Sequence, residues 1–114
     1  MHEFSICRSL IVQVEEAARE HDARSVTSIV VSLGPLAGIQ ADELLQAFPL
    51  VSAGSMAQDA RLHVHYKPLQ WRCQACGRED ESDASVERCA GCGSDRLQLL
   101  SGDRIVLEHV EVSR

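Results

Sequence analysis

Two short cysteine motifs decide how the second half of this chain folds: Cys73-Gln74-Ala75-Cys76-Gly77 and Cys89-Ala90-Gly91-Cys92-Gly93. A Cys-x-x-Cys turn brings two thiolates to one point, and two facing turns supply the tetrahedral set of four sulfurs that zinc prefers. The glycine after each second cysteine permits a tight backbone turn. Because four thiolates leave no open position for water or substrate, the motifs predict a structural zinc site and argue against zinc catalysis.

Cysteine pairs have two other common functions besides binding structural zinc. A thioredoxin-like redox pair is suggested by Trp71 beside the first motif, but two matched pairs in one short segment favour metal binding. Zinc ribbons can also bind nucleic acid. Between residues 70 and 97, however, six acidic residues outnumber four arginines and Trp71 is the only aromatic residue. Charge and stacking capacity therefore both disfavour a nucleic-acid partner.

The segment that carries the motifs cannot fold on apolar burial alone. Residues 70–97 are rich in Cys, Gly, Asp, Glu and Arg and contain few large apolar side chains, so a metal is needed as a staple. Alternating residues predict a strand at 60–67, before Pro68, and another at 104–112. The apolar residues of this last strand change parity near Glu108, which predicts a bulge.

The first half of the chain is predicted to form a helix, a strand and a second helix. Apolar residues at helical spacing predict an amphipathic helix from about Phe4 to Asp22, and alternation predicts a strand at Ser25–Leu33 with Thr27, Ile29, Val31 and Leu33 on one face. A second helix is expected from about Ala41 to Ala53, with Leu44, Leu45, Phe48 and Val51 buried. Pro49 deletes a helical hydrogen bond, so we expect a kink or an early break there.

These elements predict an α+β fold: two helices packed on a small, mainly antiparallel sheet of about three strands, with an inserted zinc-ribbon module built on four cysteines. The expected domains are an α+β domain of residues 1–69 and 101–114 and a ribbon domain of residues 70–100. No phosphate-binding loop, nucleophile elbow or paired-carboxylate signature is present. We therefore expect a protein that is not an enzyme.

The net charge and the distribution of apolar residues limit the classes of partner and the cellular location that can be expected. The 114 residues carry 17 acidic and 11 basic side chains, a net charge of −6, which favours a metal cation or a basic protein patch over nucleic acid or anionic membranes. No apolar run approaches the roughly 18 residues of a membrane span, and the first residues lack the basic region of a secretory signal. The expected location is the cytoplasm, where the five cysteines stay reduced.

Met1-His2-Glu3 is a candidate metal site only if Met1 is a free amino terminus. The α-amino nitrogen of Met1, the backbone nitrogen of His2 and the His2 imidazole can then close two adjoining chelate rings. Nickel(II) and copper(II) favour such tetragonal nitrogen shells. Glu3, through its backbone nitrogen or carboxylate, or a partner could supply the fourth position. The alternative is that His2 is simply a solvated residue before a helix.

Other candidate ligands are weaker. Cys7 lies on the apolar face of the first helix, where a free cysteine usually behaves as a small hydrophobic residue. His63 and His65 share one strand face and could chelate a metal, but a solvated polar face is favoured because Arg61 and Lys67 flank them.

Taken together, the chain closely resembles the HypA/HybF family of hydrogenase-maturation nickel metallochaperones over nearly its whole length. The stretches that carry the resemblance are Met1-His2-Glu3, Leu33-Gly34-Pro35-Leu36-Ala37-Gly38-Ile39, Gly54-Ser55-Met56-Ala57, the two cysteine pairs and Val110-Glu111-Val112. The resemblance implies nickel bound at Met1, His2 and Glu3, and zinc at Cys73, Cys76, Cys89 and Cys92. It also implies transfer of nickel to the [NiFe]-hydrogenase large subunit, with help from the pathway's nickel-handling GTPase.

Two positions depart from the family's pattern. The second knuckle often reads Cys-Pro-x-Cys in the family, whereas this chain has Cys89-Ala90-Gly91-Cys92, and Pro49 is unexpected within its helix. Neither position is a ligand. We expect a monomer or weak homodimer, and the alternative function is a zinc-ribbon adaptor that binds only proteins and has an inert amino terminus.

Overall fold

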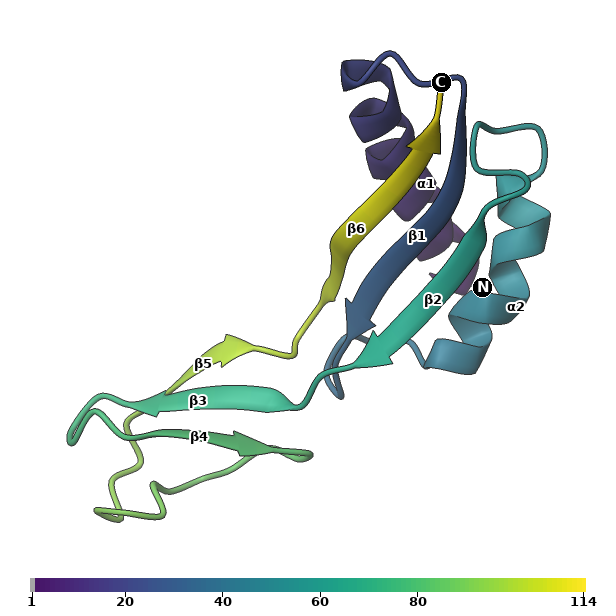
Figure 1. Cartoon of the computed structure of the whole chain (residues 1–114). Coiled ribbons are helices and arrows are strands. Elements are labelled where there is room, and N and C mark those ends of the chain that lie inside the picture. The colour runs from purple at the N-terminus through teal and green to yellow at the C-terminus, as the bar shows by residue number, and fades with distance from the viewer. Residues whose placement is uncertain (1) are drawn as a thin grey trace. The chain divides into compact units, whose positions relative to one another are not determined.

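The computed structural model describes residues 2–114 (Figure 1). Within this range the elements are α1 (His2–Glu20), β1 (Ser25–Leu33), α2 (Ala41–Ser52), β2 (Arg61–Tyr66), β3 (Leu69–Cys73), β4 (Glu79–Ser82), β5 (Leu97–Ser101) and β6 (Ile105–Ser113). The strands form two three-stranded sheets, with orders β2-β1-β6 and β4-β3-β5. The predicted α+β class is confirmed.

The chain separates into two compact units. The helical unit comprises the described residues up to Ser32, Ile39–His65 and Val106–Arg114, and the ribbon unit comprises Leu33–Gly38 and Tyr66–Ile105. Neither helix in the described range combines the length and apolarity that crossing a membrane requires.

Helix α1 buries one continuous stripe against the rest of the helical unit. The stripe consists of Cys7, Leu10, Ile11, Val14 and Ala18. The helix ends two residues before the predicted Asp22, because Asp22 adopts a left-handed φ of 53°. The N–H of Ala23 then donates to the Ala18 carbonyl at 3.0 Å, and the N–H of Asp22 donates to the Arg19 carbonyl at 3.1 Å. These bonds satisfy carbonyls of the last turn and fix the exit of the chain.

Strand β1 has the predicted bounds, but the prediction of its buried face was partly wrong. Ile29, Val31 and Leu33 are buried as expected, whereas Thr27 is exposed and its neighbour Val26 is 2% exposed. The Thr27 hydroxyl donates to the Glu111 carbonyl on β6 at 3.2 Å, so it faces a polar partner rather than the core. The alternation therefore shifts by one residue near the start of the strand.

Helix α2 runs through Pro49 to Ser52, so the predicted break is wrong. Its start is fixed by the Glu43 carboxylate, which accepts from the Gln40 N–H at 3.0 Å. The carbonyl that loses its partner to Pro49 belongs to Leu45, four residues earlier, and Leu45 is 45% exposed. Leu45 therefore lies on the solvent side of the helix, where a carbonyl without a helical partner costs less than it would in the core.

The exposure of Leu45 also corrects the predicted buried face of α2. The buried residues are Leu44, Ala47, Phe48 and Ser52, which recur at the i, i+3, i+4 and i+8 positions of one helical stripe. Leu45 and Leu50 lie on the solvent side, at 45% and 69% exposure.

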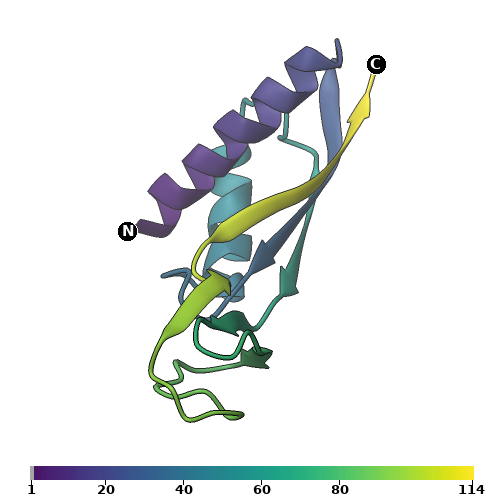
Figure 2. The same cartoon turned by 90° about the vertical axis from the view of Figure 1, so that its left-hand side faces the viewer.

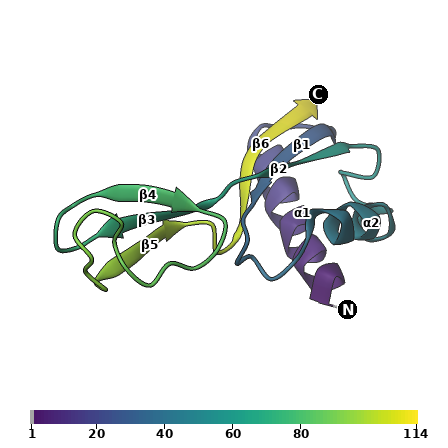
Figure 3. The ribbon, with the colours of Figure 1, turned by 90° about the horizontal axis from the view of Figure 1, so that it is seen from below.

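The two helices cover one face of the β2-β1-β6 sheet, as seen in Figure 3. Strands β1 and β2 run in the same direction and β6 runs opposite to them (Figures 1 and 2), so the sheet is mixed. In β6 the half-buried positions are Ile105, Leu107, Val110 and Val112, with both Glu108 and His109 exposed. The predicted change of parity near Glu108 is therefore present.

The ribbon unit contains three strands that the sequence patterns did not place. Strand β3 pairs antiparallel with both β4 and β5. Three backbone segments cross closely at one end of this unit: a Cβ added to Gly34 would lie 2.3 Å from the Gly102 carbonyl oxygen, and one added to Gly102 would lie 2.9 Å from the Leu69 Cα. Both positions therefore require glycine.

Candidate metal centres

The four predicted zinc ligands come together in the ribbon unit. Cys73 is the last residue of β3, Cys76 follows in the next turn, and Cys89 and Cys92 lie in the segment between β4 and β5. Their sulfur atoms all lie within 4.8 Å of one another. The Cys73–Cys92 and Cys76–Cys89 sulfur pairs are 3.6 and 3.7 Å apart. Tetrahedral zinc with bonds of about 2.3 Å requires a separation of about 3.8 Å, so the donor set fits this ion.

The two cysteine turns are built in the same way. The Gly77 N–H donates to the Cys73 carbonyl and the Gly93 N–H donates to the Cys89 carbonyl, each at 2.9 Å. Both glycines adopt left-handed backbone angles, with φ of 79° and 77°. In each turn the N–H of the first cysteine also donates to the carbonyl of the residue after the glycine. Cys73 donates to Arg78 and Cys89 donates to Ser94, both at 2.8 Å. The glycines thus reverse the chain so that both sulfurs of a pair face the same point.

Backbone amides favour the thiolate form of the first cysteine in each turn. The N–H groups of Cys76 and Ala75, with help from the neighbouring thiols, lower the pKa of Cys73 to about 6. The N–H groups of Cys92 and Gly91 likewise lower the pKa of Cys89, and Gly91 donates to its sulfur at 3.3 Å. The backbone around the cluster is therefore arranged to stabilise negative charge on these sulfurs.

Cys92 behaves differently from the first cysteine of its turn. The N–H of Ser94 acts to lower the pKa of Cys92, but hydrogen bonding to Cys73 and burial outweigh it and raise the pKa to about 11. Cys92 therefore favours its protonated form, with its sulfur 3.6 Å from the Cys73 sulfur. Ligand deprotonation by a bound cation would release that proton.

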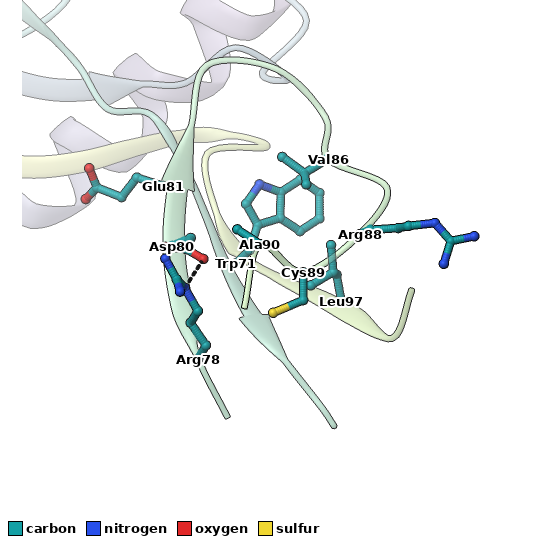
Figure 4. Close-up of a pocket in the computed structure, with 9 residues that line it drawn as sticks. All are labelled: Trp71, Arg78, Asp80, Glu81, Val86, Arg88, Cys89, Ala90 and Leu97. Atoms are coloured by element: carbon teal, nitrogen blue, oxygen red, sulfur yellow. Dashed lines mark hydrogen bonds and ion pairs between the residues drawn. The ribbon is translucent and has the colours of Figure 1, made fainter. Parts of the chain in front are cut away.

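A pocket of about 200 Å³ adjoins the cysteine cluster within the ribbon unit (Figure 4). Its walls combine apolar groups with charged ones: Trp71, Val86, Ala90 and Leu97, and Arg78, Asp80, Glu81 and Arg88, together with Cys89. The indole N–H of Trp71 donates to the Ser82 hydroxyl at 2.9 Å, which fixes the ring. Figure 4 shows Arg78 and Asp80 paired at one side and the Cys89 sulfur nearby.

Arg78 is a charged residue beside the cluster that the sequence patterns did not single out. Its Nε donates to the Asp80 carboxylate at 2.8 Å. This hydrogen bond and the Asp80 charge raise the pKa of Arg78, and the charges of Cys89 and Cys76 add a smaller contribution. The available signal was its position directly after the glycine of the first turn, where a side chain can fold back over the sulfurs.

The predicted nickel ligands fall at the start of α1. Met1 lies outside the described residues. His2 and Glu3 form the first residues of the helix, and the His2 Nδ1 lies 3.9 Å from a Glu3 carboxylate oxygen. The side chains of His2 and Glu3 are 59% and 23% exposed. The two side chains are therefore close enough to face one ion, and His2 is accessible.

The weaker candidates do not assemble into a site. Cys7 is completely buried in α1, and burial raises the pKa of its thiol. Among residues 2–114, the four-cysteine cluster is the single group of three or more His, Cys, Asp and Glu side chains close enough to hold one ion. His63 and His65 are exposed on β2 and belong to no such group.

Comparisons with known proteins identify a family and several relatives over nearly the whole chain. Residues 1–112 match the family described as "HypA: Hydrogenase/urease nickel incorporation, metallochaperone". Hydrogenase maturation factors HypA of Nitrosospira multiformis and of Aquifex aeolicus are each 40% identical over 112 residues, which cover 98% of this chain and 97% of the relative. Hydrogenase maturation factor HybF of Escherichia coli K12 is 31% identical over the same length, covering 98% of this chain and 99% of the relative.

Solved structures share the fold. The solution structure of the nickel metallochaperone HypA from Helicobacter pylori aligns with a TM-score of 0.78 at 24% identity and covers 97% of both chains. A second solution structure, of a HypA protein, aligns with a TM-score of 0.76 at 25% identity and covers 98% of this chain and 96% of that one. On the strength of the match over residues 1–112 and of relatives at 40% identity, the chain belongs to the HypA family of nickel-incorporation metallochaperones.

Proposed function

We propose that this protein binds one nickel(II) ion at its free amino terminus and delivers it to the large subunit of [NiFe]-hydrogenase. The observation that carries the proposal is the family match over residues 1–112, in a chain whose first helix begins with an exposed histidine and an acidic neighbour. The nickel-handling GTPase of the maturation pathway would assist the transfer.

The proposed nickel ligands are Met1, His2 and Glu3. The amine of Met1, the backbone nitrogen of His2 and the His2 imidazole supply three nitrogens of the tetragonal type that nickel(II) favours. The first amides of a helix donate no bond to a carbonyl one turn earlier. Coordination by the His2 backbone nitrogen would therefore break no α-helical hydrogen bond. The Glu3 carboxylate supplies negative charge close to the imidazole.

We further propose that the four cysteines hold a structural zinc ion. The sulfur separations of 3.6 and 3.7 Å support this ion, and a complete set of four thiolates leaves no position at which a substrate could bind. Zinc would supply the folding free energy of the polar segment around it. In this division, residues 1–69 and 101–114 handle nickel and residues 70–100 hold zinc.

Delivery then proceeds by ligand exchange. Three ligands from a chain terminus leave the fourth position open or weakly held, so a ligand of the acceptor can enter before the donor's ligands leave. The exposure of His2 supports such an approach by another protein. The transferred nickel is a cargo, whereas zinc stays in the protein throughout.

Equilibrium dialysis against nickel tests this function, with untagged wild type compared with His2→Ala. We expect one tightly bound nickel ion in the wild type and no tight nickel binding in the variant, since the variant lacks one of three nitrogen ligands. Zinc content and the thermal transition should hardly change, because His2 lies outside the buried stripe of α1. Nickel affinity equal to that of the wild type would instead support a zinc-ribbon adaptor with an inert amino terminus.

A further inference from the structure

Arg78 distinguishes the two otherwise similar cysteine turns. Its carbonyl accepts the Cys73 N–H at 2.8 Å, as the Ser94 carbonyl accepts the Cys89 N–H at 2.8 Å in the second turn. The equivalent of Arg78 is therefore an uncharged serine. Only the first turn carries a permanent positive charge at this position, and that charge is oriented by the 2.8 Å bond to Asp80.

The Arg78 side chain folds back over the second turn. A Cβ placed on Gly91 would lie 3.0 Å from the Arg78 Cδ, 3.3 Å from one guanidinium nitrogen and 3.7 Å from the Cys89 sulfur. The arginine and the sulfur thus both lie within 4 Å of the same point beside Gly91. Gly91 leaves room for this approach because it has no side chain.

A positive charge at this point matters because of the charge of the occupied cluster. Four thiolates around a divalent cation carry a net charge of about −2. An arginine guanidinium stays charged at any pH at which the protein is folded. Its attraction to the sulfurs stabilises the complete metal complex, and it weakens when a thiolate is protonated or leaves.

We propose that Arg78, held by Asp80, is a positioning residue that retains zinc in the four-cysteine cluster. The guanidinium offsets the negative charge at the Cys89 side of the complex and so slows the opening of the metal–sulfur shell. This inference rests on the proposed zinc site. Arg78 would then determine in part how long the metal stays bound.

A purely structural role is the competing explanation. The Arg78–Asp80 pair also joins the end of the first turn to β4, so its loss could loosen the ribbon without any electrostatic effect on the metal. The two explanations differ in whether a positive charge at position 78 is by itself sufficient to slow zinc release. They differ also in whether salt, which screens charges over roughly 10 Å at 0.1 M, changes the effect.

The test measures zinc transfer from the zinc-loaded full-length protein to the chromophoric chelator pyridylazoresorcinol. We expect Arg78→Gln to release zinc about tenfold faster than the wild type, in the range typical of lost partners of metal ligands. Arg78→Lys keeps the positive charge. On a logarithmic scale, its rate of zinc release should return at least half of the way from the Arg78→Gln rate to the wild-type rate. Raising the ionic strength should shrink the difference between Arg78→Gln and wild type.

Arg72→Gln is the matched control. Arg72 also lies in the ribbon, pairs with an acid at 3.5 Å and has a side chain 49% exposed, against 51% for Arg78. It should change zinc release less than twofold. Gly91→Ala provides a second variant that leaves every charge in place. Its new methyl group would lie 3.0 Å from the Arg78 Cδ and push the arginine away from Cys89, so release should accelerate although the arginine remains.

The outcomes separate this inference from the zinc site itself. A wild type that binds no stoichiometric zinc would overturn both. Stoichiometric zinc with equal release from Arg78→Gln and Arg72→Gln would overturn only the role of Arg78. The same holds if Arg78→Lys releases zinc as fast as Arg78→Gln and salt has no effect, because the pair would then act only as a structural link.

Discussion

Tyr66, the only tyrosine in the chain, reports on its own local contact. Its hydroxyl donates to the Asp83 carboxylate at 2.7 Å. This hydrogen bond, with burial and the Asp83 charge, raises the pKa of Tyr66 above its ordinary value of 10.0. A raised pKa means that the folded state favours the protonated phenol. The stabilisation is therefore complete below about pH 10 and is lost as pH rises through the folded-state pKa.

We predict that the near-ultraviolet absorbance of tyrosinate appears in the wild type at a higher pH than in a model peptide. In Asp83→Ala the midpoint should return towards the ordinary value, because both the acceptor and the negative charge are removed. Coincident midpoints in the two proteins would show that the Tyr66–Asp83 bond does not persist in solution.

Ser52 presents the opposite case, a buried polar atom without a partner. It is 0% exposed, and its hydroxyl oxygen makes no hydrogen bond to any part of the chain that the structure describes. A buried unsatisfied hydroxyl costs roughly 1–3 kcal/mol. Alanine removes that cost and also has the higher helix propensity.

We therefore predict that Ser52→Ala raises the free energy of unfolding by about 1 kcal/mol in urea titrations. Ser55→Ala is the matched control, because the Ser55 hydroxyl donates to the Ser52 carbonyl at 2.6 Å and accepts the Ala57 N–H at 3.1 Å. It should destabilise the protein by about 1 kcal/mol. A loss of stability in Ser52→Ala would mean that its hydroxyl has a partner after all.

At the scale of elements, the ribbon strands depend on the cysteine cluster. Strands β3, β4 and β5 contain only two fully buried side chains, Leu69 and Cys73. Short strands with so little apolar burial are not stable alone. A metal held by the four cysteines would therefore supply much of the free energy that orders them.

We predict that Cys73→Ala loses its zinc, as measured by elemental analysis, and loses amide protection across residues 66–105 in hydrogen exchange. The amides of α1 and β1 should stay protected, because their core of Cys7, Val14, Ile29 and other residues belongs to the helical unit. Retained zinc with a protected ribbon would contradict the assignment of Cys73 as an essential ligand.

The elements that could be predicted from sequence are those whose apolar residues recur mostly at helical or alternating spacing. Helix α1 and strand β1 have such patterns, and their positions were predicted to within two residues. The inward face of β1 was wrong at Thr27 because the alternation shifts there. Helix α2 continues through Pro49, and the 45% exposure of Leu45, whose carbonyl loses its helical partner, becomes visible only after tertiary packing is known.

The ribbon unit shows more clearly what could not be predicted from sequence. The spacing of four cysteines identified the metal cluster, because a Cys-x-x-Cys turn imposes its own geometry. Strand β4 reads Glu-Asp-Glu-Ser, and neither its propensity nor its hydrophobicity indicates a strand. It is a strand because it pairs with β3. The position of Arg78 beside Cys89 likewise depends on Gly91, which is thirteen residues further along the chain than Arg78.

At the scale of the whole molecule, the family assignment confirms that the chain is a maturation factor rather than a catalyst. The proposed nickel ligands that the structure describes, His2 and Glu3, belong to the helical unit. The four cysteines belong to the ribbon unit. No residue serves both proposed metals, so the two binding reactions share no ligand.

We predict that nickel and zinc binding respond to different changes of the chain. An extension of even one residue before Met1 removes the chelating amine and moves the imidazole out of register. Nickel affinity measured by calorimetry should therefore fall as it does in His2→Ala. A carboxy-terminal tag without metal-binding residues should leave it unchanged, and both tagged proteins should keep their zinc.

The reciprocal variant completes this prediction. Cys73→Ala should lose zinc but keep nickel affinity within about threefold of the wild type, since mutations at sites without shared partners have nearly additive effects. Equal nickel affinity in all the tagged proteins would place nickel away from the terminus, with the exposed His63 and His65 on β2 the next residues to replace. Loss of nickel binding in Cys73→Ala would instead require that the cysteine cluster takes part in holding the cargo. The division of labour between the two units would then be wrong.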